Sequence, residues 1–267
     1  MIITYLYHSG FAVELEHHIL LFDYYTGEEK NNTKQSWELP TWDKEKLICV
    51  FVSHKHHDHF DMNVFRLADV YPKIHFFLGS DVKLSEKYLE RNGVSAAIKE
   101  KMTNIGKNRQ LAYEDIDIET LRSTDAGVAF LVCVEGKNFY HAGDLNWWHW
   151  EEETELYNEN MKKSYGKEID RLEGKHFNAA FVPLDPRQGE AYRYGMDYFL
   201  AKASADYVFP MHMWEQYDWI QKYKNALMQE NDSKYDECHM ANENSMACKC
   251  KNCIMEIKHA FTQFFIA

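Results

Sequence analysis

Four side chains that can bind a metal ion fall within six consecutive residues: His54, His56, Asp58 and His59. Neutral imidazole and carboxylate are preferred ligands of zinc and of similar borderline cations. In an extended turn, His54 and His56 point to one side, whereas Asp58 and His59 can reach a second ion. The spacing therefore predicts a metal site; if such a site activates water, the carboxylate of Asp58 can also accept a proton. The alternative is a solvated, histidine-rich loop.

The residues on either side favour the metal site over the loop. Leu47 to Val52 is an almost unbroken apolar run, which is typical of a strand buried on both faces. Asp61 can cap a helix that begins near Met62. The segment thus connects a central strand to a helix, and a solvated loop has no need to occupy that position.

Three further apolar segments end in a carboxylate or an imidazole, at Asp23, Asp144 and His212. The first follows Leu20–Phe22, and the second follows a hairpin predicted over residues 127–141. Each residue also has an ordinary explanation. Asp23 can form a turn, Asp144 can cap a helix, and a lone histidine on an apolar face is usually a core residue.

The pattern His-x-His-x-Asp-His at the end of an apolar strand resembles the signature of the metallo-β-lactamase superfamily. The resemblance covers roughly residues 1–228 and implies an α+β or α/β fold, a four-layer αββα sandwich with one or two metal ions at its rim. It implies that Asp144 bridges the two ions, since each carboxylate oxygen can bind one of them. It assigns His212 to the second ion, and it places Asp23 behind the ligating imidazoles, which such carboxylates orient.

The resemblance also suggests roles for two residues near turns. His8 resembles a histidine near the pocket of lactonase-like members, although a turn residue explains it equally well. Arg187 can bind a phosphate or carboxylate group of a substrate, or it is only a surface turn residue. The short chain, the start His8-Ser9-Gly10-Phe11 and the acidic composition look most like the lactonase-like, small-substrate hydrolases.

The chain departs from the family pattern at one ligand position. Family members have another metal-binding histidine ahead of the hairpin, where this chain reads Ser123-Thr124-Asp125-Ala126-Gly127. Asp125 could replace the imidazole, because carboxylate oxygen is a competent ligand. A site completed by His54, His56 and Asp144 would then be harder and would favour manganese or iron over zinc. The replacement could equally leave that site weak or empty.

Composition and charge limit the partners that we expect. The 267 residues are 45% hydrophobic and 27% charged, which is ordinary for a globular protein that can bury a full core. The net charge of −12 repels phosphate groups, so we expect a small-molecule substrate and neither nucleic acid nor membrane as a partner. Without a secretion signal or a long apolar run, we expect a cytoplasmic protein.

Helices are predicted near residues 62–70, 150–172, 189–205 and 214–228. Ser80 can cap another helix, which Gly93 would end. Residues 229–267 are expected to complete the same domain with a polar loop and closing strands. Their cysteines are Cys238, Cys248, Cys250 and Cys253. A single Cys-x-x-Cys pair favours free thiols in a loop over a structural zinc site.

The chemistry that fits these residues is metal-dependent hydrolysis of a small ester, lactone or phosphoester. Two divalent ions, zinc first and manganese or iron as alternatives, would lower the pKa of a bridging water and supply hydroxide. The alternative is a non-hydrolytic member, either a di-iron redox enzyme or a metal-binding scaffold without turnover. Asp125 keeps this alternative open, because a fold does not decide its chemistry.

Overall fold

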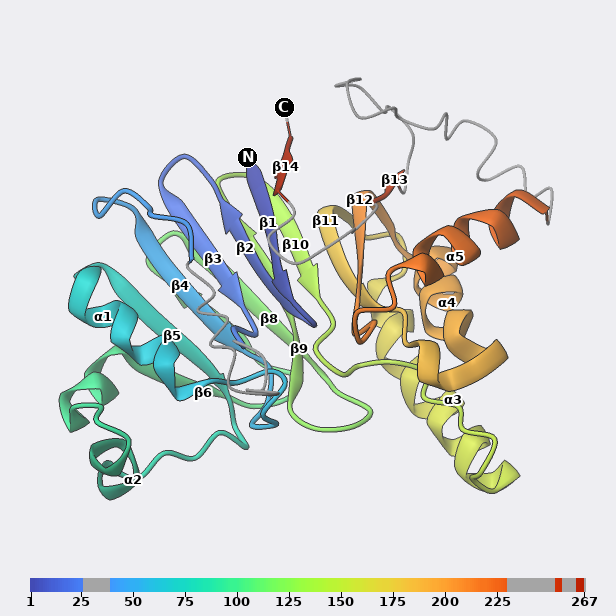
Figure 1. Ribbon diagram of the computed structural model, residues 1–267, viewed down its shortest axis with the longest axis horizontal. Coiled ribbons are helices and arrows are strands. Elements are labelled where there is room, and N and C mark those ends of the chain that lie inside the picture. The colour runs from blue at the N-terminus through green and yellow to red at the C-terminus, as the bar shows by residue number, and fades with distance from the viewer. Residues whose placement is uncertain (26–38, 230–252, 256–262, 267) are drawn as a thin grey trace.

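The computed structural model describes residues 1–25, 39–229, 253–255 and 263–266. In this part of the chain two sheets pack face to face, and helices lie on the outer side of each (Figure 1). The four-layer αββα sandwich expected from the sequence is therefore confirmed. The loop predicted to contain Cys238, Cys248 and Cys250 lies outside the described residues, and only the backbone of Cys253 is described.

The first sheet has seven described strands in the order β14-β1-β2-β3-β4-β5-β6. They are β1 (Ile2–Tyr7), β2 (Gly10–Glu14), β3 (His18–Phe22), β4 (Leu47–Val52), β5 (Ile74–Gly79), β6 (Met102–Ile105) and β14 (Gln263–Phe265). Strands β3 to β6 run parallel, whereas β2 is antiparallel to both β1 and β3. Strand β1 therefore ends at the same edge of the sheet as β3 and β4.

The second sheet has seven described strands in the order β13-β12-β11-β10-β9-β8-β7. They are β7 (Gln110–Tyr113), β8 (Ile116–Arg122), β9 (Val128–Val134), β10 (Lys137–His141), β11 (His176–Pro183), β12 (Ser204–Met211) and β13 (Cys253–Ile254). Strands β10 to β13 run parallel, and β7 to β10 pair antiparallel. The hairpin predicted over residues 127–141 is β9–β10.

The described helices divide between the two outer layers. On the first sheet they are η1 (Met62–Arg66), α1 (Leu67–Val70), α2 (Glu86–Arg91) and η2 (Ala96–Lys101). On the second sheet they are α3 (Glu155–Ile169), η3 (Asp170–Leu172), η4 (Pro186–Arg193), α4 (Tyr194–Lys202) and α5 (Asp218–Gln229) (Figure 1). No described helix is both long and apolar enough to span a bilayer.

Four predicted helix starts were wrong: α3 begins at Glu155 and α5 at Asp218, four or five residues later than expected, and the other two depend on local turns. Ser85 caps α2, not Ser80, because the backbone N–H of Val82 first closes a turn on the carbonyl of Gly79. The helix expected over residues 189–205 begins earlier, as η4, and Asp185 caps it by accepting from the backbone N–H of Arg187. At α2 two capping serines lie within a few residues of each other, and the local turn decided between them.

Strand β4 is central and buried on both faces, as its apolar run predicted. On the inner face Phe51 stacks between Phe22 and Phe77, with ring centroids 4.9 and 5.2 Å away. It also meets Phe130 of the opposite sheet edge-on at 5.2 Å. On the outer face Val50 packs in a second cluster beneath the helices. Burial of these rings holds the exit of β4 rigidly at the sheet edge.

Ser53 leaves β4 at a point where three glycine backbones crowd it. A Cβ on Gly79 or Gly127 would lie 2.2 or 2.0 Å from the Ser53 carbonyl oxygen. A Cβ on Gly143 would lie 2.7 Å from the Ser53 Cβ. The backbone N–H of Val128 also donates to the Ser53 carbonyl (3.1 Å), so the two sheets touch here. Only glycine permits such an approach, and it fixes where the metal-capable segment begins.

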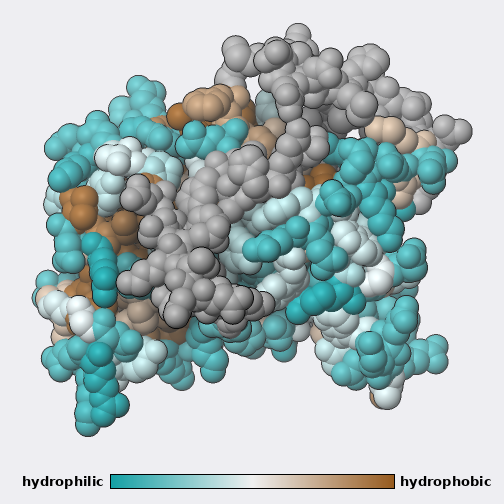
Figure 2. All heavy atoms as spheres, viewed as in Figure 1, coloured by the Kyte–Doolittle hydropathy of each residue, from teal (hydrophilic) through white to brown (hydrophobic). Residues whose placement is uncertain are grey.

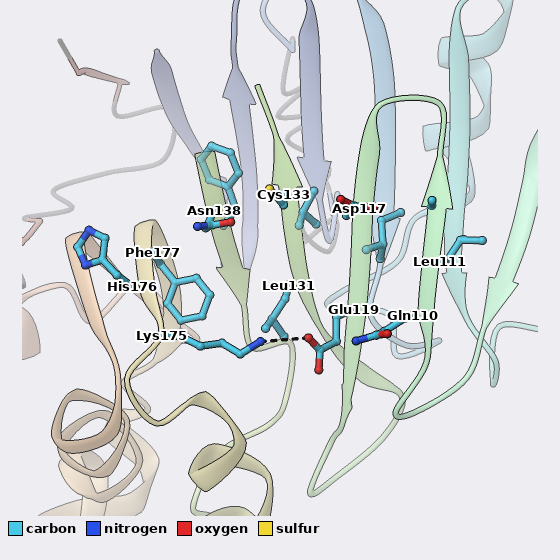
Figure 3. A pocket seen from close by; sticks show the side chains of 14 residues that line it. Gln110, Leu111, Asp117, Glu119, Leu131, Cys133, Asn138, Lys175, His176 and Phe177 are labelled. Atoms are coloured by element: carbon cyan, nitrogen blue, oxygen red, sulfur yellow. Dashed lines mark hydrogen bonds and ion pairs between the residues drawn. The ribbon is translucent and has the colours of Figure 1, made fainter. Parts of the chain in front are cut away.

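The outer face of the second sheet carries a hollow of about 670 Å³ beside β7 to β11 (Figure 3). Leu131 and Phe177 contribute apolar surface, and Lys175 pairs with Glu119 across it (3.1 Å). None of the candidate ligands lines this hollow. Figure 2 shows that polar side chains cover most of the described surface in the view it presents. The candidate chemistry is therefore found at the strand ends and not in this hollow.

We predict that Gly127→Ala lowers the free energy of unfolding by more than Gly136→Ala does. Both glycines have positive φ (67° and 68°), so both variants carry left-handed strain of roughly 1–2 kcal/mol. Only the first variant also clashes with Ser53; for Gly136, no described atom lies within 4 Å of an added Cβ. Urea denaturation measures both losses, and equal losses would contradict a tight contact at Ser53.

Candidate metal centre

The predicted ligands meet at one rim of the sandwich, because the strands that precede them all end there. Strands β1, β3, β4, β10 and β12 lead into His8, Asp23, residues 54–59, Asp144 and His212 respectively. The carboxyl ends of parallel strands commonly form binding sites for this reason. Among the sequence-predicted residues, the structure brings every candidate metal ligand into this region.

Three of these residues have a backbone conformation that is unusual for a side chain with a Cβ. His8, Asp23 and His212 have φ of 54°, 41° and 64°. Left-handed backbone at a residue other than glycine is strained, and it persists where the surrounding structure holds it. Here it turns the side chain inward at the end of a strand. Part of the backbone strain of the described chain thus lies at the site.

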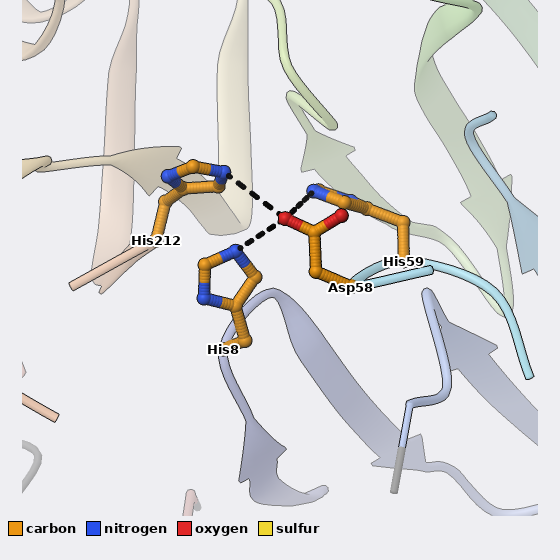
Figure 4. Close-up of side chains that lie close together, drawn as sticks. All are labelled: His8, Asp58, His59 and His212. Atoms are coloured by element: carbon orange, nitrogen blue, oxygen red, sulfur yellow. Dashed lines mark ion pairs between the residues drawn. The ribbon is translucent and has the colours of Figure 1, made fainter. Parts of the chain in front are cut away.

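Three imidazoles converge on the carboxylate of Asp58 (Figure 4). Its Oδ2 lies 3.4 Å from His8 Nε2, 3.9 Å from His59 Nε2 and 4.0 Å from His212 Nε2. A ligand atom from each of these four residues lies within 4.8 Å of the other three. We call His8, Asp58, His59 and His212 the inner group. Its spacing suits one metal ion.

A second set of ligands combines the buried His54 with two residues that are open to solvent. We call His54, His56 and Asp125 the outer group; His56 and Asp125 approach to 3.9 Å, with side chains 43% and 53% exposed. Ligand atoms of His56 and Asp125 lie within 4.8 Å of one on Asp144. Asp125, the residue where the family has a histidine, therefore lies within reach of a shared ion. Its ligation stays a prediction.

Asp144 lies between the two groups and is nearly buried. Its Oδ2 is 3.3 Å from His54 Nε2, and its Oδ1 is 3.0 Å from His59 Nε2 and 3.5 Å from His212 Nε2. Each oxygen thus faces a different group, which is the arrangement that a bridging carboxylate requires. The bridging role of Asp144 stays a prediction, and these distances support it.

Among the ligand candidates, four buried polar atoms have no hydrogen-bond partner within the described residues: His8 Nε2, His54 Nε2, His59 Nε2 and Asp144 Oδ1. His59 Nε2 and Asp144 Oδ1 lie 3.0 Å apart, but this contact lacks hydrogen-bond geometry. An unsatisfied buried polar group costs roughly 1–3 kcal/mol. Cations ligated by these atoms would satisfy all four, so the residues present fit divalent metal ions.

Asp23 orients two of the imidazoles. Its Oδ1 accepts from the Ser53 N–H (2.7 Å), and its Oδ2 accepts from the Ser53 hydroxyl (2.6 Å) and from His59 Nδ1 (2.8 Å). Because that hydroxyl donates to Asp23, it accepts from His54 Nδ1 at 2.9 Å. Both rings therefore carry hydrogen on Nδ1 and direct Nε2 toward the cluster.

Asp185 orients a third imidazole, and sequence reasoning missed it by interpreting it as a turn residue. It is fully buried, and its Oδ2 accepts from His212 Nδ1 at 2.8 Å. Only one residue separates it from the end of the apolar strand β11, much as Asp23 follows β3. A carboxylate at the exit of an apolar strand was therefore the signal that could have identified it.

Arg187 binds Asp185 with two groups of its guanidinium, Nε at 3.0 Å and Nη2 at 2.6 Å. The guanidinium lies 4.8 Å from the ring centroid of Trp214 and 5.8 Å from that of Trp150. In the described structure Arg187 binds the Asp185 carboxylate, and that carboxylate accepts a hydrogen bond from His212. The role in substrate binding proposed for Arg187 stays a prediction.

The charges of the cluster are strongly coupled. Burial opposes ionisation of Asp144, but His59 and His212 lower its pKa well below the usual value. Burial opposes a charge on His59, but Asp144 and Asp23 raise its pKa well above the usual value. Burial and the nearby His212 lower the pKa of His8 to about 3, so that ring is neutral at pH 7.

The tryptophans after Asp144 divide between two locations. Trp148 is buried, donates from Nε1 to the Asp144 carbonyl (3.0 Å) and lies edge-on to His212 at 5.4 Å. Trp150 stacks on it at 5.8 Å. Trp147 instead contacts Tyr194. Trp148 and Trp150 thus line the side of the rim next to His212, as a pocket wall would.

Comparisons with known proteins agree with the fold. A family model described as "Beta-lactamase superfamily domain" matches residues 2–158. No curated protein matches the sequence. Igni18, a metallo hydrolase from the archaeon Ignicoccus hospitalis, has a similar structure over 100% of this chain and 99% of its own, with 16% identity and a TM-score of 0.57.

Two further solved structures are similar. The isothiocyanate hydrolase from Delia radicum gut bacteria matches 100% of this chain and 99% of its own, with 12% identity and a TM-score of 0.50. A mutant of CmlA, a diiron β-hydroxylase from Streptomyces venezuelae, matches 98% of this chain and 53% of its own, with 10% identity and a TM-score of 0.53. At these identities the likeness shows the fold alone.

We predict that Asp23→Asn weakens zinc binding by roughly 10- to 100-fold, as loss of a partner behind a ligating imidazole does. The variant loses the charge that accepts from His59 and, through Ser53, orients His54. The matched control is Asp206→Asn, because Asp206 pairs with the exposed His176 at 3.0 Å. Zinc titration against a competing chelator measures both variants. An unchanged affinity in the first variant would contradict this role of Asp23.

Zinc binding near pH 7 should release protons. The raised pKa of His59 keeps that ring protonated at neutral pH, and its Nε2 must lose the proton to bind a cation. The affinity should therefore rise with pH. Calorimetric titrations in two buffers with different ionisation enthalpies measure the released protons, and a count of zero would contradict the prediction.

Proposed function

The chain belongs to the beta-lactamase superfamily, and from this membership and the geometry of the rim we propose that it is a metal-dependent hydrolase. The observation that carries the proposal is the set of buried, unpartnered ligand atoms at His8, His54, His59 and Asp144. They come from three different segments of the chain, after β1, β4 and β10, and they converge where a metal ion would satisfy them. In a cluster that served only to stabilise the core, such buried polar atoms would be hydrogen-bonded to one another.

The residues at the rim have different proposed roles in hydrolysis. Divalent ions bound at the rim would supply hydroxide near neutral pH and polarise the bond to be cleaved. Asp58 is the proposed proton acceptor, since its side chain is 13% exposed and lies at the mouth of the inner group. Burial opposes its ionisation, but His8 and His59 lower its pKa, so it is a carboxylate at neutral pH. Trp148 and Trp150 would exclude water from one side.

Two ions are proposed, with zinc in the inner group. Imidazole-rich sites suit zinc, whereas carboxylate ligands such as Asp125 suit harder ions. The outer group is therefore where manganese or iron would compete. The shared carboxylate of Asp144 supports two ions acting together, because each of its oxygens faces one group.

The proposed substrate is a small ester, lactone or phosphoester. The net charge of −12 supports a small molecule and disfavours nucleic acid, because like charges repel a polyanion over a long range. Arg187 would offer its remaining N–H groups to an anionic part of the substrate.

The second candidate function is non-hydrolytic, either di-iron redox chemistry or metal binding without turnover. Asp125 is the observation that favours it, because a carboxylate in place of an imidazole makes the outer group harder. The similar fold of a diiron β-hydroxylase keeps the same candidate open. Iron in the purified protein, together with oxygen consumption, would favour this function over hydrolysis.

We predict that protein purified without chelators contains divalent metal and cleaves at least one of an aryl ester, a lactone, a phosphodiester and an isothiocyanate. Chelation should abolish turnover, and zinc should restore it. Asp144→Asn should lower kcat roughly 100-fold or more, because several kcal/mol of charge stabilisation depend on the ions that it bridges. Asp206→Asn, remote from the rim, is the control. Metal-free protein without turnover on any probe would contradict the proposal.

A further inference from the structure

We propose that His8 is a direct ligand of the inner metal ion, so that three imidazoles and Asp58 hold that ion. This inference rests on the proposed function, because it concerns the same metal centre. It assigns the loop between β1 and β2 to the metal site and goes beyond the role near the pocket that the sequence suggested for His8.

The position of the His8 ring is the first argument. Its Nε2 lies 3.4 Å from Asp58 Oδ2, closer than the 3.9 and 4.0 Å at which His59 and His212 approach the same oxygen (Figure 4). Ligand atoms of a tetrahedral zinc site with bonds of about 2.0–2.1 Å lie roughly 3.3–3.4 Å apart. His8 therefore fits the ion at least as well as His59 and His212, the two histidines that the sequence predicted for it.

A hydrogen bond to Asp58 does not explain this position. N–H···O bonds in proteins are typically about 2.7–3.2 Å long, and the 3.4 Å contact lies beyond that range. The His8 Nε2 is fully buried and has no hydrogen-bond partner among the described residues. An atom placed in this way is unsatisfied unless a further group binds it. The same is true of His54 Nε2, His59 Nε2 and Asp144 Oδ1, which belong to predicted ligands.

The backbone holds the ring in this position. His8 has a φ of 54° between β1 and β2, and its carbonyl accepts from the backbone N–H of His212 at 3.2 Å. This bond joins the ends of β1 and β12, which belong to different sheets. The ring lies between His212 and Trp214, with centroids 4.1 and 4.4 Å away. Such a buried, packed ring is oriented before any ion binds.

The proposed ligand also accounts for the departure at Asp125. The outer group lacks the imidazole that family members have there, whereas the inner group gains one from His8. The imidazoles are thus shifted toward the buried end of the centre. We expect the inner group to bind the first equivalent of zinc or cobalt, and the outer group to bind a second equivalent more weakly, because carboxylate replaces imidazole there.

The test compares His8→Gln with the wild-type protein during titration with Co²⁺ and with Zn²⁺. The first equivalent should bind roughly 100-fold or more weakly to the variant, since loss of a ligand exceeds loss of an orienting partner. The visible spectrum of the first Co²⁺ equivalent should also change, because its ligand set changes. A merely structural role for His8 would leave that spectrum unchanged.

Two variants control the titration. Asp125→Asn should leave the first equivalent unchanged and weaken only the second, whereas His8→Gln should do the reverse. His17→Gln removes an exposed imidazole at the opposite end of the strands and should alter neither. X-ray absorption of wild-type protein with one equivalent of Zn²⁺ gives a count that needs no variant, and three imidazoles are expected.

A count of two imidazoles, or an unchanged Co²⁺ spectrum and affinity in His8→Gln, would overturn the proposal. Either result would leave the hydrolase proposal in place if the protein still bound metal and turned over substrate. Wild-type protein that binds neither ion would overturn both proposals. The two failures are therefore distinguishable.

Discussion

A carboxylate buried among hydrogen-bond donors is the interaction on which the metal rim depends. Asp23 is fully buried, and an ion in that position is costly unless donors surround it. Its donors are the backbone and hydroxyl of Ser53 and the ring of His59. The same bonds that stabilise the charge join the end of β3 to the end of β4 and orient two imidazoles. Fold and site therefore cannot be separated here.

The second sheet repeats this arrangement with different residues. Asp185 follows β11, is fully buried, and accepts from both His212 and Arg187. The first sheet thus supplies His54 and His59 and the second supplies His212, each with Nδ1 already engaged and Nε2 near Asp144. Asp144 lies between them. The distance between the two sheets, set by core side chains such as Phe51 and Phe130, consequently sets the size of the metal centre.

Close packing around the rim supports backbone that would otherwise be strained. Glycines crowd Ser53, and left-handed conformations occur at His8, Asp23 and His212. Local strain of this kind persists when surrounding contacts over-determine it, and it is concentrated at functional sites. The interleaved aromatic core supplies those contacts. The rim is therefore rigid before it binds an ion, and rigidity of ligands is what sharpens the choice among metals.

Local patterns in the sequence determined much of the fold and of the candidate metal site. The apolar run Leu47–Val52 is β4 to the residue, and the metal-capable motif follows it because a buried strand and its exit are encoded by neighbouring side chains. The hairpin before Asp144 and the strand before His212 were recognised for the same reason. The sequence did not show which of two nearby serines caps α2, because the choice of cap depends on the turn that precedes the helix.

Only the tertiary structure decided which strand ends meet. The role of Asp185 depends on its contact with His212, and the place of His8 in the inner group depends on two sheets facing each other across the core. Such contacts follow from strand order, register and sheet packing, which no local periodicity encodes. A carboxylate after an apolar strand looks the same in sequence whether it forms a turn or holds a ligand, because its partner lies far along the chain.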